Sequence, residues 1–195
     1  MELILASGSP RRSELLTHMG LRFRVQPADV EELTEADPQT LVLHNAALKA
    51  DAVSRLNPAT PVLAADTTVA LGGLVLNKPA DLEEARSMLL LLSGQTHAVF
   101  TGVSLRWAEQ DLREDFVETS HVTFRELDED TITAYFKRVD PLDKAGAYGI
   151  QEGRELIVEK WTGSLHNIIG LPTERLENVL RNLNWLNDLQ LKPVS

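Results

Sequence analysis

Hydrophobic and polar positions divide the chain into short segments that alternate between strand-like and helix-like patterns. An apolar run at residues 3–6 ends in a Ser-Gly-Ser-Pro turn, and a helically periodic segment follows at residues 11–19. Residues 21–26 alternate like a second strand, and an Asp-Pro pair then gives the start signal of a helix at residues 38–56. The first part of the chain is therefore predicted as strand, helix, strand and helix.

The middle of the chain predicts a sheet with one helix inserted. A Gly-Gly pair after an apolar, β-branched segment indicates one hairpin, and two long strand-like segments further on indicate another. The expected strands are residues 61–71, 74–76, 97–107 and 115–125. An Asp-x-x-Glu capping signal opens the intervening helix at residues 82–92, which a Ser-Gly pair closes.

The last third predicts a helix from Asp128 to residue 139, a glycine-rich loop at 140–153, a strand at 157–161 and a helix at 172–186. The chain contains no internal repeat and no linker-like tract. Alternating strands and helices favour an α/β or α+β sheet covered by helices. A length of 195 residues favours one domain that spans residues 1–195.

The overall charge of the chain excludes some classes of binding partner. With 19 basic and 29 acidic residues, the chain carries a formal charge of −10. That field repels nucleic acid and anionic membranes, so neither is expected as a partner. A small phosphorylated ligand remains compatible, because local cations, backbone amides and a metal ion can outweigh the global field at one pocket.

Two further features restrict the chemistry and the location. The sequence has no cysteine, which excludes disulfides, thiolate zinc sites and cysteine nucleophiles. The N-terminal apolar run is too short for a signal sequence or a membrane span, so a cytoplasmic protein is expected. The histidines lack the spacing of a zinc motif, and no Gly-x-Ser-x-Gly elbow accompanies them.

The turn at residues 7–12, Ser-Gly-Ser-Pro-Arg-Arg, lies where a strand passes into a helix. Free backbone amides and the positive end of the helix dipole make such a turn a candidate phosphate site, with Ser7 and Arg12 as candidate ligands. The alternative is an ordinary serine N-cap followed by solvated arginines.

Asp66 is a candidate catalytic or metal-binding residue because it interrupts an apolar strand. A carboxylate in such surroundings must be paired, hydrogen-bonded or metal-bound to remain charged. The acidic pair Glu31-Glu32 could join it in holding a divalent ion against phosphate oxygens. The alternatives are local hydrogen bonds to Thr67 or Thr68 for Asp66, and simple solvation for the acidic pair.

Two lysines and one loop complete the candidate site. Lys49 and Lys78 could each supply a point charge to a triphosphate, or lie at the surface. The loop at residues 143–151 combines small residues with a lysine and ends in Gln151, which indicates a close-fitting ligand loop. The alternative for this loop is a tight turn without a ligand.

Taken together, several ordered motifs resemble the Maf family. The segments that carry the resemblance are LILASGSPRRSELL at 3–16, ADTT at 65–68, NKP at 77–79, LSG at 92–94, DKAGAYGIQ at 143–151 and GLP at 170–172. They span nearly the whole chain in order. The chain departs from the family at residues 165–167, where a tyrosine-containing stretch is common.

The resemblance implies an elongated, two-lobed α/β fold similar to inosine triphosphate pyrophosphatase, with a mixed sheet flanked by helices. It implies that Asp66 is the proton acceptor and Glu32 the loop carboxylate of the site. Both are expected to bind a divalent cation, Mg²⁺ or Mn²⁺. Lys49 and Lys78 are implied to lie beside the phosphates.

The same resemblance implies the substrate. Arg11, Thr67 and Gln151 are similar to the specificity residues of the dTTP/UTP branch of the family. The expected reaction is metal-assisted attack of water on the α-phosphorus, giving the monophosphate and pyrophosphate, with a role in nucleotide-pool house-cleaning and a link to division arrest. A homodimer is left open.

Two alternatives of other classes are a sugar-nucleotide transferase, which needs an acceptor, and a non-enzymatic regulator of division.

Overall fold

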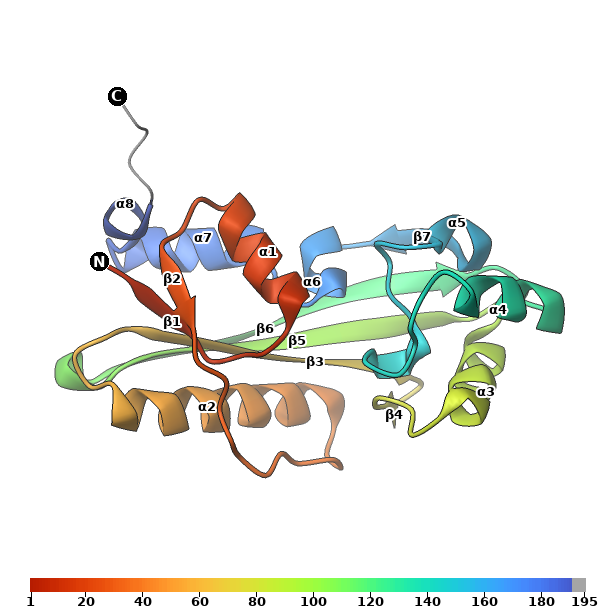
Figure 1. Ribbon diagram of the computed structural model, residues 1–195, viewed down its shortest axis with the longest axis horizontal. Coiled ribbons are helices and arrows are strands. Elements are labelled where there is room, and N and C mark those ends of the chain that lie inside the picture. The colour runs from red at the N-terminus through yellow and green to blue at the C-terminus, as the bar shows by residue number, and fades with distance from the viewer. Residues whose placement is uncertain (191–195) are drawn as a thin grey trace.

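A computed structural model of the protein, which describes residues 1–190, is built on one seven-stranded mixed sheet (Figure 1). The strand order is β2-β1-β3-β5-β6-β7, and β4 pairs with β3 beside this path. β1 is parallel to β2 and β3, whereas the remaining pairs are antiparallel. The expected mixed sheet flanked by helices is therefore confirmed.

The elements before the middle of the sheet follow the predicted order. They are β1 (Leu3–Leu5), α1 (Pro10–His18), β2 (Phe23–Val25), α2 (Pro38–Leu56), β3 (Val62–Leu71), β4 (Leu74–Leu76) and α3 (Leu82–Leu92).

The second half contains several short elements. They are β5 (Thr96–Trp107), the 3₁₀ turn η1 (Ala108–Gln110), β6 (Leu112–Phe124), α4 (Glu129–Phe136), the 3₁₀ turn η2 (Ala145–Ala147), α5 (Arg154–Ile157), β7 (Val158–Thr162), α6 (Leu165–Ile169), α7 (Thr173–Asn182) and α8 (Leu186–Leu189).

The long strands β3, β5 and β6 run along the length of an elongated molecule (Figure 1). Helix α2 covers one face of the sheet, and α1, α6 and α7 lie on the other face. Helices α3, α4 and α5 gather at the far end with β7. None of the helices within residues 1–190 is long and apolar enough to cross a membrane.

Two large hydrophobic clusters divide this length into two lobes. One packs β1, α1 and α7 together around Leu16, Leu63 and Leu176, all without exposed surface. The other packs α3 and α4 against the opposite end of the sheet around Leu89 and Tyr135, which are also fully buried. The same central strands supply both clusters, so the sheet joins the lobes, as the two-lobed expectation requires.

The predicted helix starts are confirmed in atomic detail. The side chain of Asp37 accepts hydrogen bonds from the backbone of Gln39 and Thr40, and Asp81 and Asp128 cap α3 and α4 in the same way. These aspartates satisfy amide groups that have no partner within the first helical turn. Local sequence chemistry therefore determines where these helices begin.

Several predicted boundaries differ from the structure, including the helix expected to reach residue 139, which ends at Phe136, and two short helices were not predicted. The helix expected at residues 172–186 is two helices, because Asn184 adopts a left-handed φ of 59° that ends the regular path between α7 and α8. Strand β6 begins at Leu112 and not at residue 115, because Asp111 has a left-handed φ of 48° and makes a tighter hairpin. The short helices α5 and α6 were not predicted, since neither is long enough to show a helical period.

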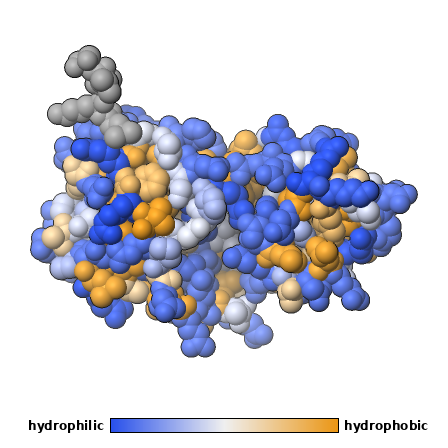
Figure 2. Space-filling model, in the orientation of Figure 1, coloured by the Kyte–Doolittle hydropathy of each residue, from blue (hydrophilic) through white to orange (hydrophobic). Residues whose placement is uncertain are grey.

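The face drawn in Figure 2 is mostly hydrophilic, and hydrophobic residues are exposed there mainly in patches toward the two ends.

Candidate active site

A cleft opens where one edge of β3 lacks a neighbouring strand. β1 pairs with β3 only as far as Leu63, and β4 begins to pair with it at Val69. The cavity beside this gap has a volume of about 950 Å³ and is lined from both lobes. Ligands of open α/β sheets commonly bind beyond the carboxyl ends of parallel strands, and β1 ends here. The volume suits a small-molecule ligand.

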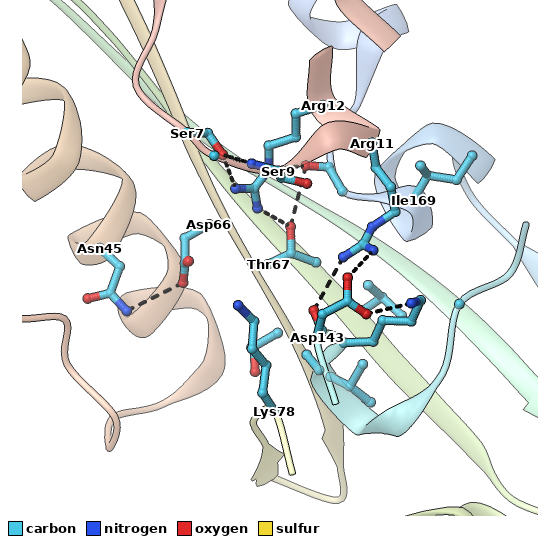
Figure 3. A pocket seen from close by; sticks show the side chains of 18 of the residues that line it. Ser7, Ser9, Arg11, Arg12, Asn45, Asp66, Thr67, Lys78, Asp143 and Ile169 are labelled. Carbon is cyan, nitrogen blue, oxygen red and sulfur yellow. Dashed lines mark hydrogen bonds and ion pairs between the residues drawn. The ribbon is translucent and has the colours of Figure 1, made fainter. Parts of the chain in front are cut away.

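Adjacent residues of β3 serve opposite walls of this cleft. Successive side chains of a strand point to opposite faces of the sheet. Asp66 hydrogen-bonds to residues of α2, whereas Thr67 hydrogen-bonds to Arg12 of α1 on the other side. Figure 3 shows the two side chains diverging from the strand. The predicted catalytic residue and the predicted specificity residue are therefore separated by the pleat of one strand.

On the α2 side, three charged groups converge. The Nζ of Lys49 lies 2.8 Å from Oδ1 of Asp66 and 2.6 Å from Oε2 of Glu32. Only 11% of the Lys49 side chain and 16% of the Asp66 side chain are exposed. The structure thus brings Asp66, Glu32 and Lys49 together as the sequence predicted, but Glu31 does not line the cleft.

The position of α2 depends on a glycine. Gly102 of β5 pairs with Asp66 in the sheet, and a Cβ added at Gly102 would lie 2.4 Å from the carbonyl oxygen of Val42. Only glycine permits so close an approach of the helix backbone to the sheet. Lys49 follows Val42 by two helical turns, so this contact sets the depth at which Lys49 meets Asp66.

The opposite wall is organised by Arg12. Its Nε donates to the carbonyl of Gly170 at 2.9 Å, its Nη1 to Oγ of Ser7 at 2.9 Å and its Nη2 to Oγ1 of Thr67 at 3.0 Å. Burial lowers the pKa of the Arg12 guanidinium, and the negative charges of Asp66 and Glu32 oppose that shift. An arginine stays protonated in proteins, so Arg12 brings a positive charge to the cleft.

The N-terminus of α1 faces the same space. Ser9 is at the N-cap position, but its side chain makes no capping hydrogen bond within the described chain. The amides of the first helical turn therefore have no side-chain partner, which is the arrangement expected of an anion site. The alternative of an ordinary serine cap is not what the structure shows.

Arg11 spans the mouth of the cleft. Its Nη1 donates to Oδ2 of Asp143 at 2.9 Å (Figure 3). The Nζ of Lys144 donates to the other carboxylate oxygen of Asp143 at 2.5 Å. Burial raises the pKa of Asp143, but the hydrogen bonds from Lys144 and Arg11 outweigh it and leave that pKa below its ordinary value. The predicted specificity residue is thus tied to the loop that leads to Gln151.

Gln151 and Lys78 also line the cleft, and both are exposed. Neither side chain hydrogen-bonds to any of residues 1–190. Figure 3 shows Lys78 pointing into the cleft. These two side chains are therefore free to meet a ligand.

The loop before Gln151 rests on a buried aromatic pair. The hydroxyl of Tyr148 lies 2.8 Å from Nε2 of His97, and His97 is 1% exposed. Burial, with a smaller contribution from His121, lowers the pKa of His97 to about 4. Burial also raises the pKa of Tyr148. Both side chains are consequently neutral at pH 7.

Sequence reasoning missed two contributors. Asn45, on α2, bonds the backbone beside Glu32, and its signal is an amide on a mostly apolar helix face. Asp143 belongs to a motif that was recognised, but its pairing with Arg11 joins residues 132 positions apart. No local pattern reports such a contact.

Known proteins resemble this chain over nearly its whole length. The family described as Maf-like protein matches residues 2–183. A protein of Akkermansia muciniphila named dTTP/UTP pyrophosphatase is 49% identical over 185 residues, covering 94% of this chain and 97% of that protein. A Bacillus cereus protein of the same name is 43% identical over 185 residues, covering 94% of this chain and 90% of its own length.

Among solved structures, a HAM1 protein from Coxiella burnetii superposes with a TM-score of 0.54 at 17% identity, covering 93% of this chain and 99% of that one. The chain therefore shares its mixed α/β fold with that HAM1 protein. Within that class, the chain belongs to the Maf family.

Proposed function

We propose that this protein hydrolyses nucleoside triphosphates, with dTTP and UTP as its substrates, to the monophosphate and pyrophosphate. The observation that carries the proposal is the cluster of Asp66, Glu32 and Lys49 in a cleft that also holds the open N-terminus of α1. The names of the Akkermansia and Bacillus relatives support the choice of nucleotide.

In the proposed reaction, water attacks the α-phosphorus and the bond from that phosphorus to the bridging oxygen of the β-phosphate breaks. Asp66 orients the water and accepts its proton. Lys49, Lys78 and Arg12 balance the charge of the phosphate oxygens, and Ser7 and the first amides of α1 hold the chain of phosphates in place. Positioning and charge stabilisation dominate phosphoryl chemistry of this kind.

A divalent cation, Mg²⁺ or Mn²⁺, fits the residues present. Two carboxylates, Asp66 and Glu32, face a single ammonium, so the cluster keeps an excess of negative charge. Residues 1–190 contain no group of three or more acidic, histidine or cysteine side chains placed to bind a metal. Two carboxylates plus phosphate oxygens are a usual environment for Mg²⁺. When bound, the cation would neutralise charge that develops on the phosphate oxygens.

Base recognition is assigned to the opposite wall. The carboxamide of Gln151 can pair with N3–H and O4 of uracil or thymine, since it both donates and accepts. The same amide can rotate to meet cytosine, so backbone groups or Arg11 must add discrimination. Thr67 contributes through Arg12, to which its hydroxyl is bonded.

The proposal also covers the cellular setting. We place the enzyme in the cytoplasm, acting on a small nucleotide and not on nucleic acid. Removal of dTTP or UTP would change the nucleotide pool, and that is the route by which the activity would bear on division arrest.

Incubation of the purified protein with each nucleoside triphosphate in H₂¹⁸O tests the reaction. With Mg²⁺ or Mn²⁺ present, we expect pyrophosphate and a monophosphate that carries the ¹⁸O label. Label in pyrophosphate, or stepwise release of orthophosphate, would contradict attack at the α-phosphorus. Dependence on an added acceptor would indicate a transferase, and no turnover would favour a binding protein. Undiminished turnover in excess chelator would remove the cation from the proposal.

A further inference from the structure

Glu32 stands on a segment that lacks regular structure. The segment runs between the end of β2 at Val25 and the start of α2 at Pro38. Residues 27–36 form no backbone-to-backbone hydrogen bond with any part of the chain from 1 to 190. Fixing such a backbone costs conformational entropy at every residue. Side chains of neighbouring elements must therefore hold Glu32 in reach of Lys49.

Asn45 hydrogen-bonds to the backbone of this segment. Its Nδ2 donates to the carbonyl oxygen of Leu33 at 3.0 Å, and its Oδ1 accepts from the amide of Leu33 at 2.9 Å. Asn45 is 3% exposed, and it precedes Lys49 by one helical turn on α2. One buried side chain thus bonds both backbone groups of the residue that follows Glu32.

The chemistry of this contact is specific to a carboxamide. A carboxylate would accept from the Leu33 amide but could not donate to its carbonyl, and an aliphatic side chain could do neither. The Nδ2 of Asn45 also lies 3.4 Å from Oδ2 of Asp66, as the dashed line in Figure 3 shows. Asn45 is therefore in contact with the carboxylate on β3 and with the segment that carries the second carboxylate.

We infer that Asn45 is a positioning residue, which holds the Glu32 carboxylate beside Lys49 and Asp66. The inference rests on the proposed function for its kinetic consequences, because Glu32 matters to turnover only if the cluster is catalytic. A second bond, from Nδ2 of Asn77 to the carbonyl of Thr34 at 3.2 Å, reaches the segment from the end of β4, but Asn77 is exposed. The buried anchor is Asn45.

Hydrogen exchange of the Leu33 amide tests the contact without reference to activity. In Asn45→Leu, we expect the Leu33 amide to exchange about 10-fold faster than in the parent, because its partner is gone. Asn45→Ala also removes both bonds, so it serves as a second variant if Asn45→Leu does not fold, and it should show the same faster exchange. Ser54→Ala, which removes a buried hydroxyl from the same helix, should leave Leu33 unchanged. Unaltered exchange in Asn45→Leu would overturn the inference.

A double-mutant cycle with dTTP or UTP tests the route of action. A shift of about 1 Å in a catalytic group can cost roughly 100-fold in rate, so Asn45→Leu should lower kcat by about 10- to 100-fold with little change in KM. If Asn45 acts through Glu32, the same substitution should change kcat by less than about 2-fold when Glu32→Gln is already present. Equal losses in both backgrounds would show that Asn45 does not work through Glu32.

These two measurements separate failure of the inference from failure of the proposed function. An inactive parent protein with rapid Leu33 exchange only in Asn45→Leu would reject the pyrophosphatase proposal and keep the positioning contact. If the parent is active but Asn45→Leu changes neither Leu33 exchange nor kcat, the positioning role is rejected and the pyrophosphatase proposal is kept.

Discussion

The two walls of the cleft differ in how firmly their polar groups are held. On the α2 wall, Lys49 and Asp66 are mostly buried and bonded to each other. On the opposite wall, 28% of the Arg11 side chain and 50% of the Asp143 side chain are exposed, and Gln151 has no protein partner among residues 1–190. The Lys49–Asp66 pair is therefore preorganised, whereas Arg11 and Gln151 remain available to a ligand. Arg12, on the same wall as Arg11, is itself fixed by hydrogen bonds to Ser7, Thr67 and Gly170.

This difference indicates a division of labour. Charged groups that are already fixed in a partly buried site need little reorganisation during a reaction. They therefore stabilise the charge of the transition state strongly. Groups that recognise a base can remain solvated until the base replaces their water. Lys49 and Gln151 show the difference most directly, because Lys49 is bonded to Asp66 whereas Gln151 is exposed.

The largest effect is expected on the α2 wall. Asp66→Asn keeps the shape of the side chain but removes its charge and its basicity, so kcat should fall by ~10²-fold or more. Initial rates with dTTP and UTP measure this, and circular dichroism checks the fold. A kcat close to that of the parent would mean that Asp66 holds Lys49 in place without taking part in the reaction.

Acid should lower the stability of the fold around the buried His97, whose ring is bonded to the hydroxyl of Tyr148. The folded pKa of His97, about 4, lies below the ordinary value of 6.5, so the unfolded chain binds the proton more readily. Stability from this group is therefore complete above about pH 6.5 and is lost as pH falls toward 4. A shift of this size corresponds to about 3 kcal/mol.

Urea unfolding at pH 7 and at pH 4.5 measures that loss, with His97→Gln as the comparison. Glutamine does not titrate and can still bond the Tyr148 hydroxyl, so the difference in unfolding free energy between the two pH values should shrink in this variant. An identical pH dependence in both proteins would assign the effect to other groups.

Gln151→Ala should affect recognition and not chemistry. Loss of a hydrogen bond to a bound base costs ~1–3 kcal/mol, so kcat/KM for dTTP or UTP should drop by ~5- to 150-fold. Nucleotides that never used this bond should lose less. The measurement is kcat/KM for dTTP, UTP, CTP and GTP in both proteins, and an equal fall for all four would assign Gln151 to the structure of the loop.

The smallest effect is expected from Asp143→Asn. This change removes the charge that holds Arg11 but keeps a hydrogen-bond acceptor, and exposed ion pairs contribute only ~0.2–1 kcal/mol. The ratio of kcat/KM for UTP to that for CTP should shift by about 2- to 5-fold at low salt, and by less at high salt. Arg11→Ala should shift the same ratio. If the shift in the double variant equals the sum of the two single shifts, the two residues act independently.

Local chemistry explains which parts of the fold the sequence could predict. Helix starts could be predicted at Asp37, Asp81 and Asp128 because a capping bond joins residues only two or three positions apart. The α7–α8 break at Asn184 was missed because the apolar spacing continues through it, and only the backbone shows the left-handed turn. Short helices such as α5 contain too few residues to show a helical pattern of apolar positions.

The same distinction between local and long-range information holds for the site. The sequence by itself determined the candidate set, because a carboxylate such as Asp66 in an apolar strand and a phosphate-type turn before a helix are unusual enough to stand out, and the family motifs fall on the same residues. Only the tertiary structure decided which of these side chains meet. Lys49 lies between Glu32 and Asp66 because α2 packs tightly on Gly102, and Arg11 meets Asp143 across the mouth of the cleft. Those contacts join segments far apart in the chain, so they depend on packing that no local pattern encodes.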